Sequence, residues 1–211
     1  MSSEFEIKDS GERTEFHTGA VRDMGGNKPR PDLISPFFLH RVRSELLKYV
    51  QDLTTPIWRS VAVPDMLVDL HTYLDSYSMG CKGEDMLAKA SIVLLTLLHS
   101  DSDEGVTAIP NKIISPYALM RVGEHMRKGA EKYGEHNWEK GIPNSVCLAS
   151  ATRHILKYEA GYTDEDHLAA AVFNIMAMIH NEEVAERRVT LLVPDAAALV
   201  DVPVYDSSCK E

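Results

Sequence analysis

An all-α fold is predicted by three features of this sequence: long segments with helical periodicity, repeated helix-start signals, and the lack of any extended strand pattern. A serine followed by a proline, which suits an N-cap and the first helical position, occurs at Ser35 and Pro36 and again at Ser115 and Pro116. With 44% hydrophobic and 26% charged residues, the chain of 211 residues has the composition of one globular domain.

The elements follow in order along the chain. Helices are expected over residues 36–52, 64–78, 83–99, 115–133, 144–159 and 163–188. Prolines and glycines punctuate residues 1–35, which are predicted to form an irregular N-terminal arm. Residues 100–114 are predicted to be a loop, and residues 193–211 a C-terminal tail. A single all-α domain is therefore expected over residues 36–192.

The balance of charge limits the partners that this chain can bind. Twenty-two Lys and Arg residues stand against 32 Asp and Glu residues, which gives a formal net charge of −10. Such a surface repels a nucleic acid, whereas a small phosphate ligand remains compatible because a divalent cation bridges carboxylates and phosphates. We expect no nucleic-acid partner.

Cysteine usage and hydropathy indicate a cytoplasmic protein. The three cysteines are an odd number, lie far apart and lack metal-ligand spacing, which fits a reducing compartment. The polar and acidic first residues are unlike a signal peptide. The longest apolar run, residues 168–179, is too short to span a bilayer and is interrupted by Asn174, so we expect no membrane partner.

The last predicted helix carries the clearest signal for a buried site. A helix that is apolar on all sides, as residues 168–179 are apart from Asn174, is expected at the centre of a bundle. His167, Asn174 and Asn181 recur every seven residues and therefore share one face. This polar seam either fixes the register between helices or lines a ligand site, and small residues at 170 and 171 leave room for a ligand.

Acidic and histidine side chains gather beside this seam. Asp164, Glu165 and Asp166 precede His167, and such acids either cap a helix start or hold a hard cation. On the preceding helix, His154 lies on a partly apolar face, where it is either a satisfied core residue or a ligand. Arg153 and Lys157 form a neighbouring basic face that suits either solvent or phosphate oxygens.

A turn rich in aromatic and amide groups joins the two halves of this region. Residues 129–141, GAEKYGEHNWEKG, place Tyr133, Asn137 and Trp138 between glycines, where they either anchor a surface loop or stack on a base and bond its edge. Residues 117–158 hold seven Lys or Arg against four Glu, a local charge of +3 that favours an anionic ligand. No phosphate-binding loop with Lys-Ser/Thr, GxSxG elbow or HExxH motif occurs.

Five segments together resemble a known family: TGAVRD (18–23), KPRPDLISP (28–36), GAEKYGEHNWEKGIP (129–143), RHILKYEAG (153–161) and DEDHLAAAVFN (164–174). They resemble phage-encoded dATP/dGTP diphosphohydrolases, which are relatives or analogues of the MazG-like all-α nucleotide pyrophosphohydrolases. Residues 50–112 match no part of this motif set and are interpreted as a helical insertion.

The resemblance implies a MazG-like helical bundle that hydrolyses purine deoxynucleoside triphosphates, dGTP and also dATP, to the monophosphate and pyrophosphate. It implies a divalent metal, Mg²⁺ or Mn²⁺ with Co²⁺ as a further candidate, and a homo-oligomer, dimer or tetramer. In phages that replace adenine by 2-aminoadenine, such an enzyme supplies dGMP for synthesis of the modified nucleotide, and its location is the host cytoplasm.

The chain departs from the MazG pattern of ExxE on one helix and ExxD on the next. The corresponding helices carry Arg153 and His154 with Lys157 and Tyr158, and Asp166 and His167 with Asn174. Residue roles are therefore assigned from local chemistry. The expected metal ligands are Glu159, Asp164 and Asp166. The expected catalytic residues are His154, His167 and Asp166. The expected substrate-binding residues are Lys28, Arg30, Lys132, Tyr133, Asn137, Trp138, Lys140, Arg153 and Asn174.

Two alternative functions remain open from the sequence. A triphosphohydrolase would release the nucleoside and inorganic triphosphate, so the phosphate product distinguishes it from a diphosphohydrolase. A non-catalytic nucleotide-binding regulator would bind a deoxynucleoside triphosphate and turn over none with any metal.

Overall fold

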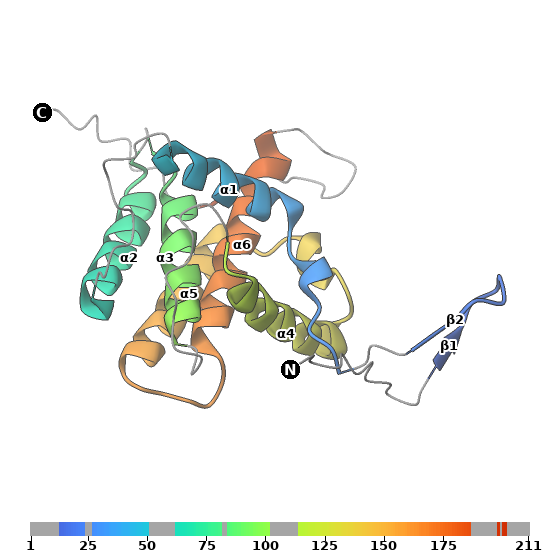
Figure 1. Cartoon of the computed structure of the whole chain (residues 1–211). Coiled ribbons are helices and arrows are strands. Elements are labelled where there is room, and N and C mark those ends of the chain that lie inside the picture. Colours follow the sequence, from blue (N-terminus) through green and yellow to red (C-terminus); the bar gives the residue numbers. More distant parts are fainter. Residues whose placement is uncertain are drawn as a thin grey trace, which may run out of the picture.

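A computed structural model describes residues 13–23, 27–50, 62–81, 84–101 and 114–186, together with residues 198, 200 and 201. The helices of this part are α1 (Pro36–Val50), α2 (Val63–Ser78), α3 (Met86–Ser100), α4 (Pro116–Tyr133), α5 (Asn144–Glu159) and α6 (His167–Glu186) (Figure 1). Two 3₁₀ helices, η1 (Pro31–Leu33) and η2 (Asn137–Lys140), precede α1 and α5. The all-α prediction is confirmed, and among the described helices none is long and apolar enough to cross a membrane.

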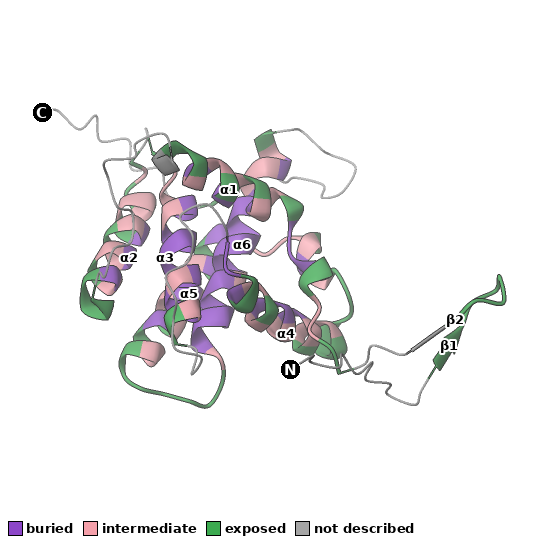
Figure 2. Cartoon of the chain, in the orientation of Figure 1, coloured by how far each residue is buried: buried purple, intermediate pink, exposed green. Residues whose placement is uncertain are grey.

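Helix α6 lies at the centre of the bundle, as its apolar sequence predicts. It packs against α1, α3, α4, α5 and η2, and almost every residue from His167 to Asn181 is buried. Figure 2 shows this burial in purple along most of α6, with a second buried stretch along α3. Because α6 has no solvent-facing side over this length, its polar side chains must find partners inside the protein.

Both predicted serine caps are present, and each serine also contacts a histidine. The Ser35 hydroxyl accepts from the Phe38 N–H at 3.5 Å and lies 3.1 Å from His180 Nδ1. Ser115 accepts from the Ala118 N–H at 3.2 Å and lies 2.8 Å from a second ring, that of His99. The serines therefore cap α1 and α4 and also attach those helix starts to neighbouring helices.

The N-terminal arm contains regular structure that its glycines and prolines did not predict. Strands β1 (Arg13–Glu15) and β2 (Val21–Asp23) pair antiparallel, with Thr14 opposite Arg22, and the hairpin stands apart from the helices in Figure 1. Three-residue strands are too short to produce a recognisable alternation in the sequence.

Farther along the arm, a close backbone approach attaches η1 to α4. The Arg30 N–H donates to the Gly123 carbonyl at 2.8 Å. A Cβ atom on Gly123 would lie 2.8 Å from the Pro31 nitrogen, so only glycine allows this contact. Leu33 and Ile34 are consequently buried in the common core.

The segment 50–112 contributes directly to that core. Helix α3 lies between α1, α2, α4 and α6, and ten of its residues are buried. That this segment is an insertion relative to the family stays a prediction, but the part of it that the structure describes is no peripheral addition. Residues 51–61, 82–83 and 102–113 lie outside the described residues.

A buried polar network fixes the end of α6 and the start of α5. Arg41 contacts Glu182 at 2.5 Å, and Tyr77 donates to the same carboxylate at 2.8 Å. The network continues from Tyr77 to Asn144 at 3.0 Å and from Asn144 to Asn181 at 2.9 Å. Asn181 also donates to the Ile142 carbonyl at 2.7 Å, which holds the loop before α5 against α6.

Two glycines of α4 should respond oppositely to the same substitution. Gly123→Ala should destabilise the protein by about 1–3 kcal/mol, because the new methyl group overlaps the backbone of Pro31. Gly129→Ala should stabilise it by about 0.4–1 kcal/mol, since a Cβ there meets no atom within 4 Å and alanine favours the helix. Urea unfolding of both variants measures the difference, and equal effects of the two would contradict this packing.

Buried histidines predict sensitivity to acid. Burial lowers the pKa of His125, His154 and His180 below the usual 6.5. As the pH falls below 6.5, these histidines therefore become protonated in the unfolded chain while they stay neutral in the folded chain. The free energy of unfolding decreases until the pH falls below the folded-state pKa values. Above that window the stability is fully present.

Unfolding measured on both sides of this window tests the expectation. His180→Asn should flatten the pH dependence, whereas His40→Asn, on an exposed α1 position, should leave it unchanged. A free energy of unfolding that stays constant through the window would show that the buried histidines do not govern it.

Candidate active site

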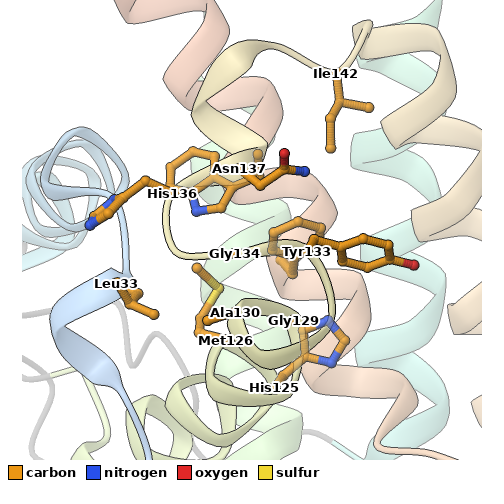
Figure 3. A pocket seen from close by; sticks show the side chains of 12 residues that line it. Leu33, His125, Met126, Gly129, Ala130, Tyr133, Gly134, His136, Asn137 and Ile142 are labelled. Carbon is orange, nitrogen blue, oxygen red and sulfur yellow. The ribbon is translucent and has the colours of Figure 1, made fainter.

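A cavity of about 320 Å³ lies between the end of α4, the η2 loop and α6. Leu33 and Tyr133 lie on opposite sides of it in Figure 3, with Met126 and Ala130 of α4 between them. Its volume is within the range of pockets that bind small molecules. The predicted substrate residues Tyr133, Asn137 and Trp138 all line this cavity, so the structure brings this part of the predicted site together.

The backbone of residues 134–141 shapes one wall. Gly134 ends α4 with φ of 90°, and Gly141 ends η2 with φ of 103°, values that glycine adopts without strain. Between them, His136 takes a left-handed φ of 56° and starts η2. These three turns fold the segment back over the bundle, which presents Asn137 and Trp138 to the cavity rather than to solvent.

Aromatic rings form much of the lining. Five of the lining residues carry an aromatic or imidazole ring: His125, Tyr133, His136, Trp138 and Phe173. The Trp138 ring is held edge-on against Phe173 and His180, with centroids 6.4 and 4.8 Å away. Such a set of flat and largely apolar surfaces suits a planar heterocycle, because an aromatic side chain can stack on the π-face of any base.

His125 connects this cavity to a second group of polar side chains. Its ring lines the cavity and packs against Phe173 with centroids 5.5 Å apart. Burial lowers the pKa of His125, and the nearby charges of Glu165 and Asp166 oppose that shift. The acidic start of α6 therefore lies close enough to the cavity to act electrostatically on one of its lining residues.

The second group is a cluster of His154, Glu165 and His167. One ligand atom from each of the three lies within 4.8 Å of those of the other two. The two imidazole Nδ1 atoms are 3.2 Å apart, and a Glu165 oxygen is 3.3 Å from the His154 nitrogen and 3.5 Å from the His167 nitrogen. Two imidazoles and one carboxylate form a three-ligand set of the kind that holds a catalytic divalent cation.

Asp164 determines which nitrogen of His167 is available. His167 Nε2 lies 2.9 Å from Asp164, so the ionised carboxylate holds the ring proton on Nε2 and leaves the Nδ1 lone pair toward the cluster. Lys157, 3.0 Å from Asp164, is the main cause of the lowered pKa of this carboxyl group, and the bond from His167 adds to it. Asp164, predicted as a metal ligand, contacts His167 in the structure, and its role as a ligand stays a prediction.

Asp166, predicted as both metal ligand and catalytic group, is engaged elsewhere. Its two oxygens receive a bidentate pair from Arg121 at 2.8 and 2.9 Å, and one of them also accepts from the Ala169 N–H. Arg121 also binds the Leu98 carbonyl at the end of α3. Asp166 therefore caps α6 and attaches it to α3 and α4 through Arg121.

Glu159 and Arg153 lie outside this cluster in the structure. Glu159 pairs with His71 of α2 at 2.7 Å, and Arg153 is exposed and bonds Ser150 on its own helix at 3.2 Å. Asn174 is buried and donates to the Ala170 carbonyl of its own helix at 2.8 Å.

Of the other predicted phosphate-binding cations, two contact residues that line the cavity and two lie in the arm. Lys140 bonds Asn137 at 3.1 Å, and Lys132 lies over the Tyr133 ring at 4.9 Å. Arg30 pairs with Asp32 and with Glu135, and Lys28 is exposed. The arm thus reaches the loop before η2 through the ion pair between Arg30 and Glu135.

Two residues central to this geometry were not singled out from the sequence as ligands or site residues. Glu165 was seen only as one acid of three, and its partners were needed to distinguish it from Asp164 and Asp166. His125 lies four residues after Arg121 on α4, so it shares the face that meets α6. This four-residue spacing is the sequence feature that could have identified His125.

The cluster predicts selective metal binding. Titration with Mn²⁺ followed by calorimetry should give one site, and Glu165→Gln and His167→Asn should each abolish it. Asp164→Asn should weaken it by about 10–100-fold, because the ligand ring loses the acceptor that orients it. Asp166→Asn should keep the affinity and instead lower the stability by about 1–3 kcal/mol. Loss of metal binding only in Asp166→Asn would contradict this assignment.

Comparison with known proteins matches the region that contains both groups. A family model described as dATP/dGTP diphosphohydrolase, N-terminal, matches residues 99–190, which hold the cluster and every cavity-lining residue except Leu33. No match was found among the curated proteins or among the solved structures. Residues 99–190 are therefore similar to the N-terminal region of dATP/dGTP diphosphohydrolases.

Proposed function

We propose that this protein hydrolyses purine deoxynucleoside triphosphates to the monophosphate and pyrophosphate, with the base in the aromatic cavity and the phosphates at the His154, Glu165 and His167 cluster. The observation that carries the proposal is the position of His125, which lines the cavity and lies near the charges of Glu165 and Asp166. A flat apolar pocket next to a three-ligand cluster suits one ligand with a planar and an anionic end.

The donor set favours a first-row transition-metal cation over Mg²⁺. Mg²⁺ prefers oxygen ligands, whereas two imidazoles together with one carboxylate suit Mn²⁺ or Co²⁺ better. His154, Glu165 and His167 would hold the ion, with Asp164 orienting the His167 ring. When bound there, a divalent cation neutralises phosphate charge and lowers the pKa of a coordinated water.

Side chains of the protein bind the base and the phosphates. The aromatic rings of the cavity hold the base and exclude water from one end of the substrate. His125 is neutral near pH 7, because burial lowers its pKa, and its ring can therefore both donate and accept a hydrogen bond between base and phosphates. Lys132 and Lys140, beside the cavity on Tyr133 and Asn137, supply positive charge for phosphate oxygens.

The same proposal extends to biological role and assembly. The resemblance of the motif segments to phage-encoded enzymes supports a role in supplying dGMP for 2-aminoadenine nucleotide synthesis in the host cytoplasm. A dimer or tetramer is supported by apolar side chains left exposed on α5, among them Val146 and Leu156.

Product analysis tests the reaction. The purified protein, given each of the common deoxynucleoside and ribonucleoside triphosphates with Mg²⁺, Mn²⁺ or Co²⁺, should convert dGTP or dATP to the monophosphate and an equal amount of pyrophosphate. Mn²⁺ or Co²⁺ should give the higher rate, and a chelator should stop the reaction. Anion-exchange separation identifies the products.

Matched variants connect the products to the cluster. Glu165→Gln should lower kcat by at least about 100-fold, as expected for loss of a residue that holds a catalytic cation. Glu183→Gln, which changes an acid near the opposite end of α6 from the cluster, serves as the control and should retain activity. Inorganic triphosphate as the main product would replace this proposal with a triphosphohydrolase, and binding without turnover would indicate a nucleotide-binding regulator.

A further inference from the structure

We infer that the indole N–H of Trp138 selects purines by donating a hydrogen bond to N7 of the base. The inference rests on the proposed function and deepens it, because it names the atom that the cavity recognises.

The first observation is an unsatisfied donor. Trp138 is 8% exposed, lines the cavity, and its Nε1 atom is buried without a hydrogen-bond partner among the residues that the structure describes. An unpaired buried donor is rare and destabilising, so its retention in a folded chain calls for an explanation. A ligand acceptor that enters the adjoining cavity provides one.

The second observation is that the ring is fixed. Phe173 packs against Trp138 at an interplanar angle of 84° and His180 at 76°, so the indole is packed edge-on against rings from two positions of α6. His180 is in turn attached to Ser35 at the start of α1. The direction of the N–H bond is consequently set before a ligand arrives, which favours a directional contact over a general apolar one.

The chemistry of the base identifies the acceptor. An indole N–H donates only, so it requires a lone pair on the ligand. A family that acts on both dATP and dGTP needs an acceptor common to the two bases. Guanine O6 does not qualify, because adenine carries an amino donor at that position, whereas N7 accepts in both purines.

One other ring nitrogen, N3, also accepts in both purines. It lies on the edge of the base that faces the sugar, whereas N7 lies on the opposite, open edge. A base that stacks within an aromatic pocket, with its sugar and phosphates directed toward the cluster, presents the N7 edge to the pocket wall. Pyrimidines have no equivalent of N7, so this contact separates the two classes of base.

A cycle of analogues and variants tests the inference. The wild-type protein should process 7-deaza-dGTP with kcat/KM about tenfold below that of dGTP, the equivalent of about 1.4 kcal/mol, and 3-deaza-dGTP without such a loss. Trp138→Phe keeps an aromatic ring and removes the N–H. This variant should process dGTP and 7-deaza-dGTP equally well and should discriminate less against dCTP.

Two controls keep the result interpretable. Trp58→Phe changes the other tryptophan of the chain, which lies outside the described residues, and should retain the preference for N7. If Trp138→Phe fails to fold, the comparison of 7-deaza with 3-deaza substrates on the wild-type protein still decides the question.

Binding separates failure of the inference from failure of the proposed function. Calorimetry without metal should show dGMP binding more tightly than 7-deaza-dGMP, whether or not any triphosphate is hydrolysed. Hydrolysis of dGTP with no effect of 7-deaza substitution would overturn the inference alone. A loss confined to 3-deaza substrates would overturn it in favour of the sugar edge.

Discussion

From His167 to Asn181, helix α6 is enclosed by protein, so each polar side chain of this stretch must find a partner inside the bundle. This requirement organises the rest of the structure. At its start, His167 contacts Asp164 and His154, and at its far end Asn181 holds the Ile142 carbonyl. Buried polar groups are costly without partners, and α6 therefore fixes the positions of α5 and of the loop that closes the cavity.

The three consecutive acids before α6 show how partners assign different roles to similar residues. Asp166 is bound by Arg121 and caps the helix, Asp164 orients the His167 ring, and Glu165 alone reaches both imidazoles. A carboxylate that already accepts two hydrogen bonds from a guanidinium is a poor metal ligand, because a cation would have to displace Arg121. Asp166 thus contributes to stability, whereas Asp164 and Glu165 contribute to the cluster.

Glycine has opposite consequences in two parts of α4. Gly123 lets the arm approach α4 closely enough for Leu33 to reach the core and one wall of the cavity. Gly129 faces the cavity itself, where a missing side chain leaves space at the expense of helix stability. Gly123 thus allows close packing and Gly129 leaves the cavity open. The sequence alone does not distinguish these two roles of glycine.

The sequence by itself determined the all-α class, the serine caps, the burial of α6 and the approximate ends of most helices, because these depend on periodicity and on contacts within a few residues. The predicted start of the last helix at residue 163 was wrong, since α6 begins at His167 and Asp166 caps it. The sequence also identified Tyr133, Asn137 and Trp138 as one group, since they lie within a single turn. Only the tertiary structure decided which acid joins His154 and His167, because Asp166 is bound by Arg121, 45 residues away along the chain, and Asp164 is bound by Lys157 of the preceding helix. It alone placed His125 in the cavity wall within the electrostatic influence of Glu165 and Asp166, because that position depends on how α4 packs against α6, which local sequence does not encode.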